Sequence, residues 1–133
     1  EVYSHPENQV EVGWYPINPV GQGRRIFGTL THVYQWHREG FELPDNAVRL
    51  AFGGAMGPFR EQAYMAGRHA FATQFHPEMY LKMMDTWLAR AGHMTELPGA
   101  MRIDSHRSGL VRYYQKQSLW LKRTLNFWVH SIL

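Results

Sequence analysis

The segment Phe71–Tyr80, FATQFHPEMY, decides the fold because it joins a strand, a forced turn and a helix start. Its alternation of large apolar residues with smaller or polar ones predicts a half-buried strand that stops at His76. Pro77 cannot donate a hydrogen bond to a sheet but fits the first turn of a helix, so we expect Glu78 to open a helix. A histidine at a strand end would then lie beside a carboxylate, an arrangement that suits a general base and the group that orients it.

The composition is that of an ordinary globular domain. Of the 133 residues, 44% are hydrophobic and 19% are charged, and the net charge is +3. The chain has no cysteine, which excludes disulfides, zinc–thiolate sites and a cysteine nucleophile within these residues. No apolar run is long enough to span a membrane, and the basic residues are mostly dispersed. We therefore expect no membrane and no nucleic-acid partner.

Outward from the central segment, the pattern predicts strands followed by two helices. The expected strands are 10–15, ending at Pro16, then 31–37, 47–52, and a hairpin of 62–66 and 70–75 with its turn at 67–69. A loop is expected over 16–23, because it is rich in proline and glycine. The expected helices are 80–91 and a last helix from about Ser108, which keeps an apolar stripe.

Four motifs in order resemble one family, the class I triad-type glutamine amidotransferases. They are GWYPI (13–17), VYQWHREGFELP (33–44), QAYMAG (62–67) and QFHPEM (74–79). The resemblance runs from Val2 to about Trp87 and is strongest to stand-alone proteins similar to the glutaminase domain of GMP synthase.

The resemblance implies an α/β fold, specifically the C-terminal half of a flavodoxin-like three-layer domain with strands over 1–75 and two C-terminal helices. Residues 1–133 would form one partial domain, with 105–133 as a C-terminal helical extension. Because a parallel sheet of this kind is covered on both faces, half of it would leave an open edge. We therefore expect the missing N-terminal half of the domain, a second chain or a homodimer against this sheet.

The resemblance also implies a Cys–His–Glu triad that hydrolyses the amide of glutamine or of a γ-glutamyl compound without a cofactor, in the cytoplasm. His76 would be the base and Glu78 would orient it, while the cysteine lies outside these residues. The segment Trp36, His37, Arg38 and Glu39 would border the substrate, largely through main-chain groups. Family members often have glycine at the position of Arg38. The chain alone should be inactive.

Two other interpretations remain open. The missing cysteine is also compatible with a catalytically inactive, amidotransferase-like binding or interaction module. A metal-dependent hydrolase could use His37, His76 and Glu78, because imidazole and carboxylate ligands suit zinc or iron, although their spacing gives little support.

Overall fold

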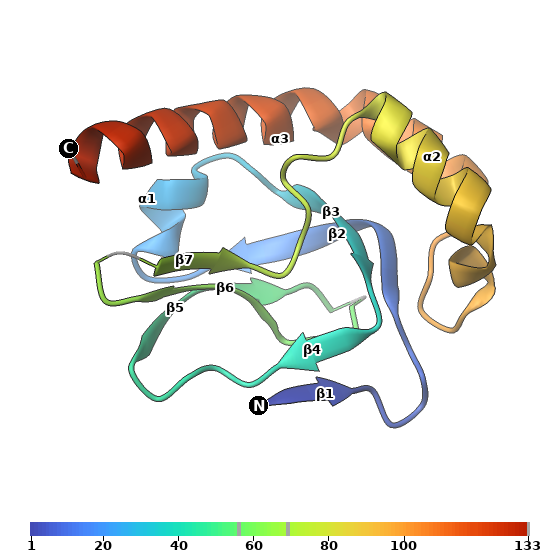
Figure 1. Ribbon diagram of the computed structural model, residues 1–133, viewed down its shortest axis with the longest axis horizontal. Coiled ribbons are helices and arrows are strands. Elements are labelled where there is room, and N and C mark those ends of the chain that lie inside the picture. The colour runs from blue at the N-terminus through green and yellow to red at the C-terminus, as the bar shows by residue number, and fades with distance from the viewer. Residues whose placement is uncertain (56, 69, 133) are drawn as a thin grey trace.

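The computed structural model is a mixed α/β fold in which strands precede two long helices, as predicted (Figure 1). It describes residues 1–55, 57–68 and 70–132, with side chains to residue 130. The strands are β1 (Val2–Ser4), β2 (Glu11–Pro19), β3 (His32–His37), β4 (Glu39–Phe41), β5 (Ala47–Gly53), β6 (Glu61–Ala66) and β7 (Ala70–Thr73). The helices are α1 (Gly23–Phe27), α2 (Leu81–Ala91), the 3₁₀ helix η1 (Gly92–Glu96) and α3 (Ile103–Ile132).

The main sheet has five strands in the order β3-β2-β5-β6-β7, and β1 pairs with β4 in a separate ribbon. Every strand pair among the described residues is antiparallel, so the parallel sheet inferred from the resemblance is not found in this part of the chain. The hairpin of β6 and β7 forms as predicted. His69, the last residue of its expected turn, lies outside the described residues.

Strand β2 changes its partner in the middle, which explains two errors of the sequence analysis. It pairs with β3 up to Pro16 and with β5 from Ile17 onward, so the proline lies at the change of partner. A proline is tolerated there because the change of partner interrupts the regular ladder. The strand therefore continues to Pro19 through the first part of the loop expected over 16–23. Helix α1 begins at Gly23, where that loop was expected to end.

Strands β5 and β6 each carry one residue that the pairing skips. Arg49 pairs with Tyr64 and Ala51 with Ala63, so Leu50 is extra in β5, and Gln62 is then extra in β6. The skipped carbonyls find other donors: Leu50 O accepts from Val20 N–H at 2.9 Å, and Gln62 O accepts from Gln74 N–H at 2.8 Å. Bulges of this kind bend the strand and increase its twist.

The sheet curls so strongly that the segment after β7 reaches the opposite edge. β7 ends at Thr73, before the predicted end at His76, and the chain then crosses toward β3. There the His76 N–H donates to Tyr34 O at 2.8 Å. The curl therefore delivers His76 to the edge of β3, a strand that pairs with β2 alone in the sheet.

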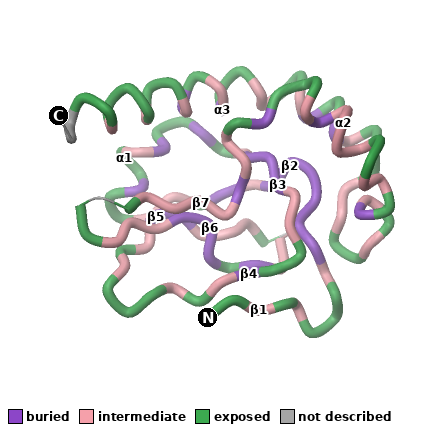
Figure 2. The backbone as a smooth tube through the Cα atoms, viewed as in Figure 1, coloured by how far each residue is buried: buried purple, intermediate pink, exposed green. Residues whose placement is uncertain are grey.

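The helices lie together above the sheet, and their inner sides are more buried than their outer sides (Figures 1 and 2). α2 begins at Leu81 rather than at Glu78, and α3 begins at Ile103 rather than near Ser108. Trp120 of α3 stacks on Phe27 of α1 with ring centroids 5.1 Å apart, and both side chains are buried in the largest hydrophobic cluster. In the part of the chain described, no helix is long and apolar enough to cross a membrane.

Candidate active site

His76 and Glu78 are paired in the turn between β7 and α2. The Nδ1 atom of His76 lies 2.8 Å from Glu78 Oε1. The side chains are 34% and 50% exposed, respectively, so the pair is open to solvent rather than sealed in the core. Because α2 begins only at Leu81, the pairing comes from the turn and not from a helix N-terminus, which corrects the expected position of Glu78.

The pairing gives the two imidazole nitrogens different roles. A carboxylate can only accept a hydrogen bond, so Nδ1 must be the donor. In the neutral ring the Nδ1 atom therefore carries the proton, and Nε2 keeps its lone pair. Within residues 1–55, 57–68 and 70–130, His76 Nε2 has no hydrogen-bond partner. This side of the ring is therefore available to take a proton from a group placed against it.

Aromatic side chains from β3 and α2 form the wall beside His76. Trp87 of α2 meets the imidazole edge-on, with centroids 4.9 Å apart and an interplanar angle of 69°. Trp36 of β3 packs against Trp87 at 5.6 Å. The sequence analysis included Trp36 among the candidate site residues but not Trp87. The helical spacing that placed Trp87 on the inner face of α2 was the available signal.

Gln117 of α3 fixes the backbone on both sides of the contact between His76 and β3. It is fully buried, and its Oε1 accepts from Tyr34 N–H at 2.9 Å. Its Nε2 lies 3.2 Å from His76 O and 3.4 Å from Pro77 O. The sequence analysis missed this residue. The signal was a polar side chain on the otherwise apolar stripe of the last helix.

Behind this contact, Tyr34 and His106 form a buried polar pair. Tyr34 Oη lies 2.9 Å from His106 Nδ1, and His106 Nε2 lies 3.2 Å from Met101 O. Burial raises the pKa of Tyr34 and lowers the pKa of His106. The neutral histidine satisfies both contacts by donating from Nε2 and accepting at Nδ1. The pair therefore holds β3 to the start of α3 without a charge.

Trp36 of the predicted substrate-binding segment lies in the aromatic wall beside His76. The side chain of the next residue, His37, points away from this wall. His37 Nδ1 lies 2.8 Å from Glu39 O, and its Nε2 lies 3.0 Å from Glu11 Oε2. Glu39 contacts the segment before His76 through its carbonyl, which accepts from Gln74 Nε2 at 3.3 Å. Arg38 is exposed in the bend between β3 and β4.

His37 belongs to a buried polar cluster that the sequence analysis did not foresee. Glu11 and Gln62 are fully buried, and Gln62 Nε2 donates to Glu11 Oε2 at 2.9 Å. The other carboxylate oxygen, Glu11 Oε1, has no hydrogen-bond partner among the described residues. With both ring nitrogens of His37 engaged there, His37, His76 and Glu78 do not form a shared metal site. The described residues contain no cluster of three or more potential metal-ligating His, Asp or Glu side chains.

Two solved structures of glutamine amidotransferases have the same fold as this chain. One is a glutamine amido transferase from Methylobacillus flagellatus, with a TM-score of 0.83 and 21% identity over 98% of this chain and 55% of that chain. The other, from Thermotoga maritima, has a TM-score of 0.67 and 21% identity over 93% of this chain and 54% of that chain. No family model and no curated protein matches the chain. The protein thus has the fold of part of a glutamine amidotransferase, spanning about half the length of these structures.

Proposed function

We propose that this chain supplies the histidine and the glutamate of a Cys–His–Glu triad that hydrolyses the side-chain amide of glutamine or of a γ-glutamyl compound. The observation that carries the proposal is the 2.8 Å contact between His76 Nδ1 and Glu78 Oε1, while Nε2 has no hydrogen-bond partner among the described residues. The cysteine would come from a part of the protein outside these 133 residues or from a second chain, because the sequence has none.

In the proposed reaction, His76 Nε2 takes the thiol proton and the thiolate attacks the amide carbon. The same nitrogen then returns the proton to the departing nitrogen, so ammonia leaves and a thioester remains. Water, deprotonated by His76, hydrolyses the thioester to glutamate and regenerates the thiol. Glu78 holds the ring in the tautomer that these transfers need and stabilises the imidazolium between them.

The segment 36–39 would border the substrate beside this histidine. Its support is the contact of Trp36 with the aromatic wall and the hydrogen bond from Gln74 to Glu39 O, which joins this segment to the strand end before His76. Arg38, exposed at the bend, would present its main chain to the substrate in the same way. His37 would act through its backbone, because its ring is held by Glu11 and Glu39.

The test is ammonia release from glutamine by a preparation that combines this chain with the other half of an amidotransferase domain, as one longer polypeptide or by co-expression. We expect His76→Ala to lower the rate by at least about 10²-fold, the usual contribution of a general base. His130→Ala, a change of an exposed histidine on α3, is the matched control and should retain the rate. Undiminished activity in His76→Ala would sink the proposed role.

The absence of cysteine also favours a second candidate, an inactive amidotransferase-like binding module. This alternative expects the chain alone to be the functional form and to leave glutamine unchanged. Comparing the intact mass of the natural protein with its reading frame separates the two. A natural product that begins at Glu1 and has no cysteine-bearing partner supports the module.

A further inference from the structure

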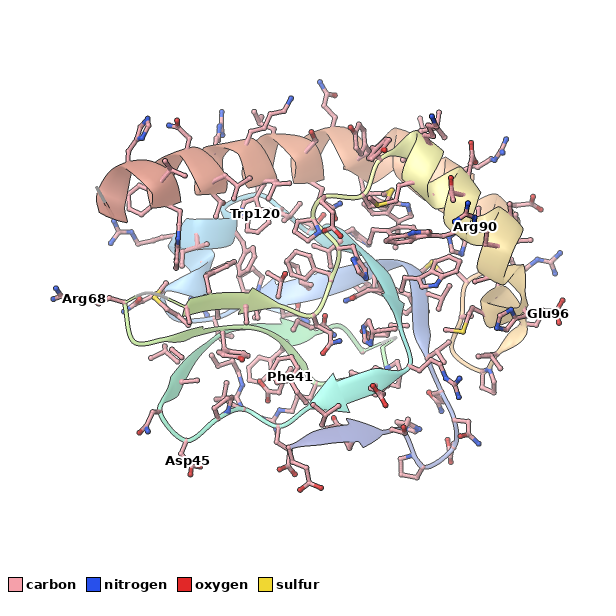
Figure 3. The ribbon with its side chains drawn as sticks, in the orientation of Figure 1. Phe41, Asp45, Arg68, Arg90, Glu96 and Trp120 are labelled. Atoms are coloured by element: carbon pink, nitrogen blue, oxygen red, sulfur yellow. The ribbon has the colours of Figure 1, made fainter. Side chains whose placement is uncertain are left out.

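A groove between α1 and α3 lies apart from the His76 site and has a cavity volume of about 720 Å³. Its floor includes the buried Phe27 and Trp120, and Trp120 Nε1 donates to Ile26 O at 2.9 Å, which fixes the two helices to each other. Figure 3 shows Trp120 beneath α3, on the side that faces α1. Neither His76 nor Glu78 is among the lining residues, so the groove is a separate feature.

The face of α3 toward the groove alternates cations and apolar side chains. Lys116, Trp120, Arg123 and Phe127 line the groove and follow one another at intervals of three or four residues, which places them on one side of the helix. Phe127 is 71% exposed although it is large and apolar. An exposed aromatic residue one helical turn from the cation Arg123 is a surface that an apolar group with an attached anion would cover.

The described residues that line the groove carry positive charge and include no acidic side chain. Arg25 of α1 joins Lys116 and Arg123 of α3 as lining cations. The sequence has no acidic residue from 12 to 38 or from 105 to 133. The ion pairs formed by the described residues involve none of these three cations.

We propose that this groove binds a small amphipathic anion, in which one carboxylate is joined to an acyl or aryl body. The carboxylate lies among Arg25, Lys116 and Arg123, and the apolar body lies on Trp120 and Phe127. The volume is within the range of small-molecule sites, which are mostly apolar with a few placed polar groups. A soluble ligand is favoured over a lipid surface because the apolar floor is recessed between two helices rather than presented on a flat face. The inference does not depend on the proposed triad.

The test is calorimetric titration of the purified protein with decanoate below its micelle concentration, followed in parallel by tryptophan fluorescence. We expect one ligand per chain, and a Kd about tenfold higher in Arg123→Gln, as expected for the loss of one charge-assisted contact. Lys122→Gln removes the adjacent exposed cation, which does not line the groove, and should leave the Kd unchanged.

A second pair of changes tests the apolar part. Thr124→Trp places a large side chain in the groove and should abolish binding, while Phe127→Ala removes an exposed wall and should weaken binding without affecting the fold. Decanol and acetate are the ligand controls, and each should bind far more weakly than decanoate.

Equal weakening by Arg123→Gln and Lys122→Gln would overturn the proposal, as would equal affinity for decanol. Several ligands per chain, or no binding of decanoate, would also contradict it. If the Thr124→Trp variant still bound anionic lipid vesicles, the cations would serve to bind a membrane surface. That result would reject the small-molecule site.

Discussion

The two nitrogens of the His76 ring have different surroundings, and that difference can be measured without any enzymatic activity. Nδ1 is hydrogen-bonded to Glu78, whereas Nε2 has no hydrogen-bond partner among the described residues. Among the described residues, Glu78 is hydrogen-bonded to the ring and Trp87 only packs against it, so the carboxylate selects the tautomer. The first prediction tests this selection directly.

In Glu78→Ala, the neutral His76 ring should lose its preference for a proton on Nδ1. Nitrogen-15 chemical shifts of the imidazole, recorded at a pH where the ring is neutral, report the tautomer. Glu78→Asp retains a carboxylate, which only accepts hydrogen bonds, and is the matched control, which should keep the Nδ1–H form. An unchanged tautomer in Glu78→Ala would show that another group orients the ring.

The stability of the protein should decrease in mild acid because of His106. Burial lowers the pKa of this histidine from its ordinary value of 6.5, so the unfolded chain binds a proton at higher pH than the folded chain. Its contribution is complete above pH 6.5 and is lost as the pH falls toward the folded pKa. His32, whose pKa burial also lowers, adds an effect of the same sign.

Urea denaturation at a series of pH values measures this effect. In His106→Gln, the slope of the unfolding free energy against pH below 6.5 should be smaller than in the unmodified protein. The variant is compared with itself across pH, so a general loss of stability does not affect the result. His130→Gln, at an exposed position, should leave the slope intact.

At the scale of the elements, Gln117 of α3 hydrogen-bonds to the backbone on both sides of the contact between β3 and His76. Gln117→Leu would leave the buried Tyr34 N–H without its acceptor, whereas His76 O would keep its hydrogen bond from Met79 N–H at 3.3 Å. A buried unsatisfied group costs about 1–3 kcal/mol. We expect a loss of unfolding free energy of that order, together with faster hydrogen exchange at the Tyr34 amide. Gln115→Leu, at an exposed position on the same helix, should change neither.

The packing of α3 on α1 should depend on Trp120 and not on Phe127. Trp120 is 7% exposed and stacks on Phe27, so Trp120→Ala should cost about 3–5 kcal/mol. Phe127 is 71% exposed, and Phe127→Ala should change the unfolding free energy by less than about 0.5 kcal/mol. Denaturation midpoints compare the two variants. Equal losses would mean that α3 packs differently.

The sequence predicted the elements whose signals are local. Alternating side chains identified β3, and the hairpin of β6 and β7 was found from its alternation and its glycine turn. Pro16 was taken as the end of a strand because a proline usually interrupts a ladder, but β2 continues by changing partner there. That change depends on where β3 and β5 lie in space. The local sequence around Pro16 does not predict these positions.

The same distinction applies to the candidate site. The pair of His76 and Glu78 is two residues apart, so the sequence could bring the side chains together. Gln117 is distant in sequence and reaches Tyr34 only because the sheet curls under α3. Its exact partners follow from the fold, although a polar residue on an apolar helical stripe already indicates a buried hydrogen bond.

At the scale of the whole molecule, the backbone bonds that close the curl should be among the most stable. The Gln74 amide donates to Gln62 O of the neighbouring strand β6, and the His76 amide donates to Tyr34 O of β3, at the opposite edge of the sheet. We expect these two amides to exchange with solvent only on global unfolding. Amides of α3 beyond residue 125, where the side chains are mostly exposed, should exchange earlier.

Hydrogen exchange followed by NMR at increasing urea distinguishes these classes of amide. If His76 exchanged at the rate of a free loop, the connection to β3 would be a weak contact rather than part of the cooperative structure. The amides of β2, which lies between β3 and β5, provide the internal reference for global opening.

Leu50 is the extra residue of β5, and the position of His76 depends on it although β5 does not contact His76. With Leu50 deleted, the register with β6 would be regular at that point, and the carbonyl that now holds Val20 would be lost. A flatter sheet would move the end of β7 away from Tyr34. The His76 side chain would then be unchanged but would no longer lie beside β3. The position of His76 therefore depends on the number of residues in a distant strand. We expect the deletion of one residue from β5 to displace His76 more than many substitutions beside its ring would.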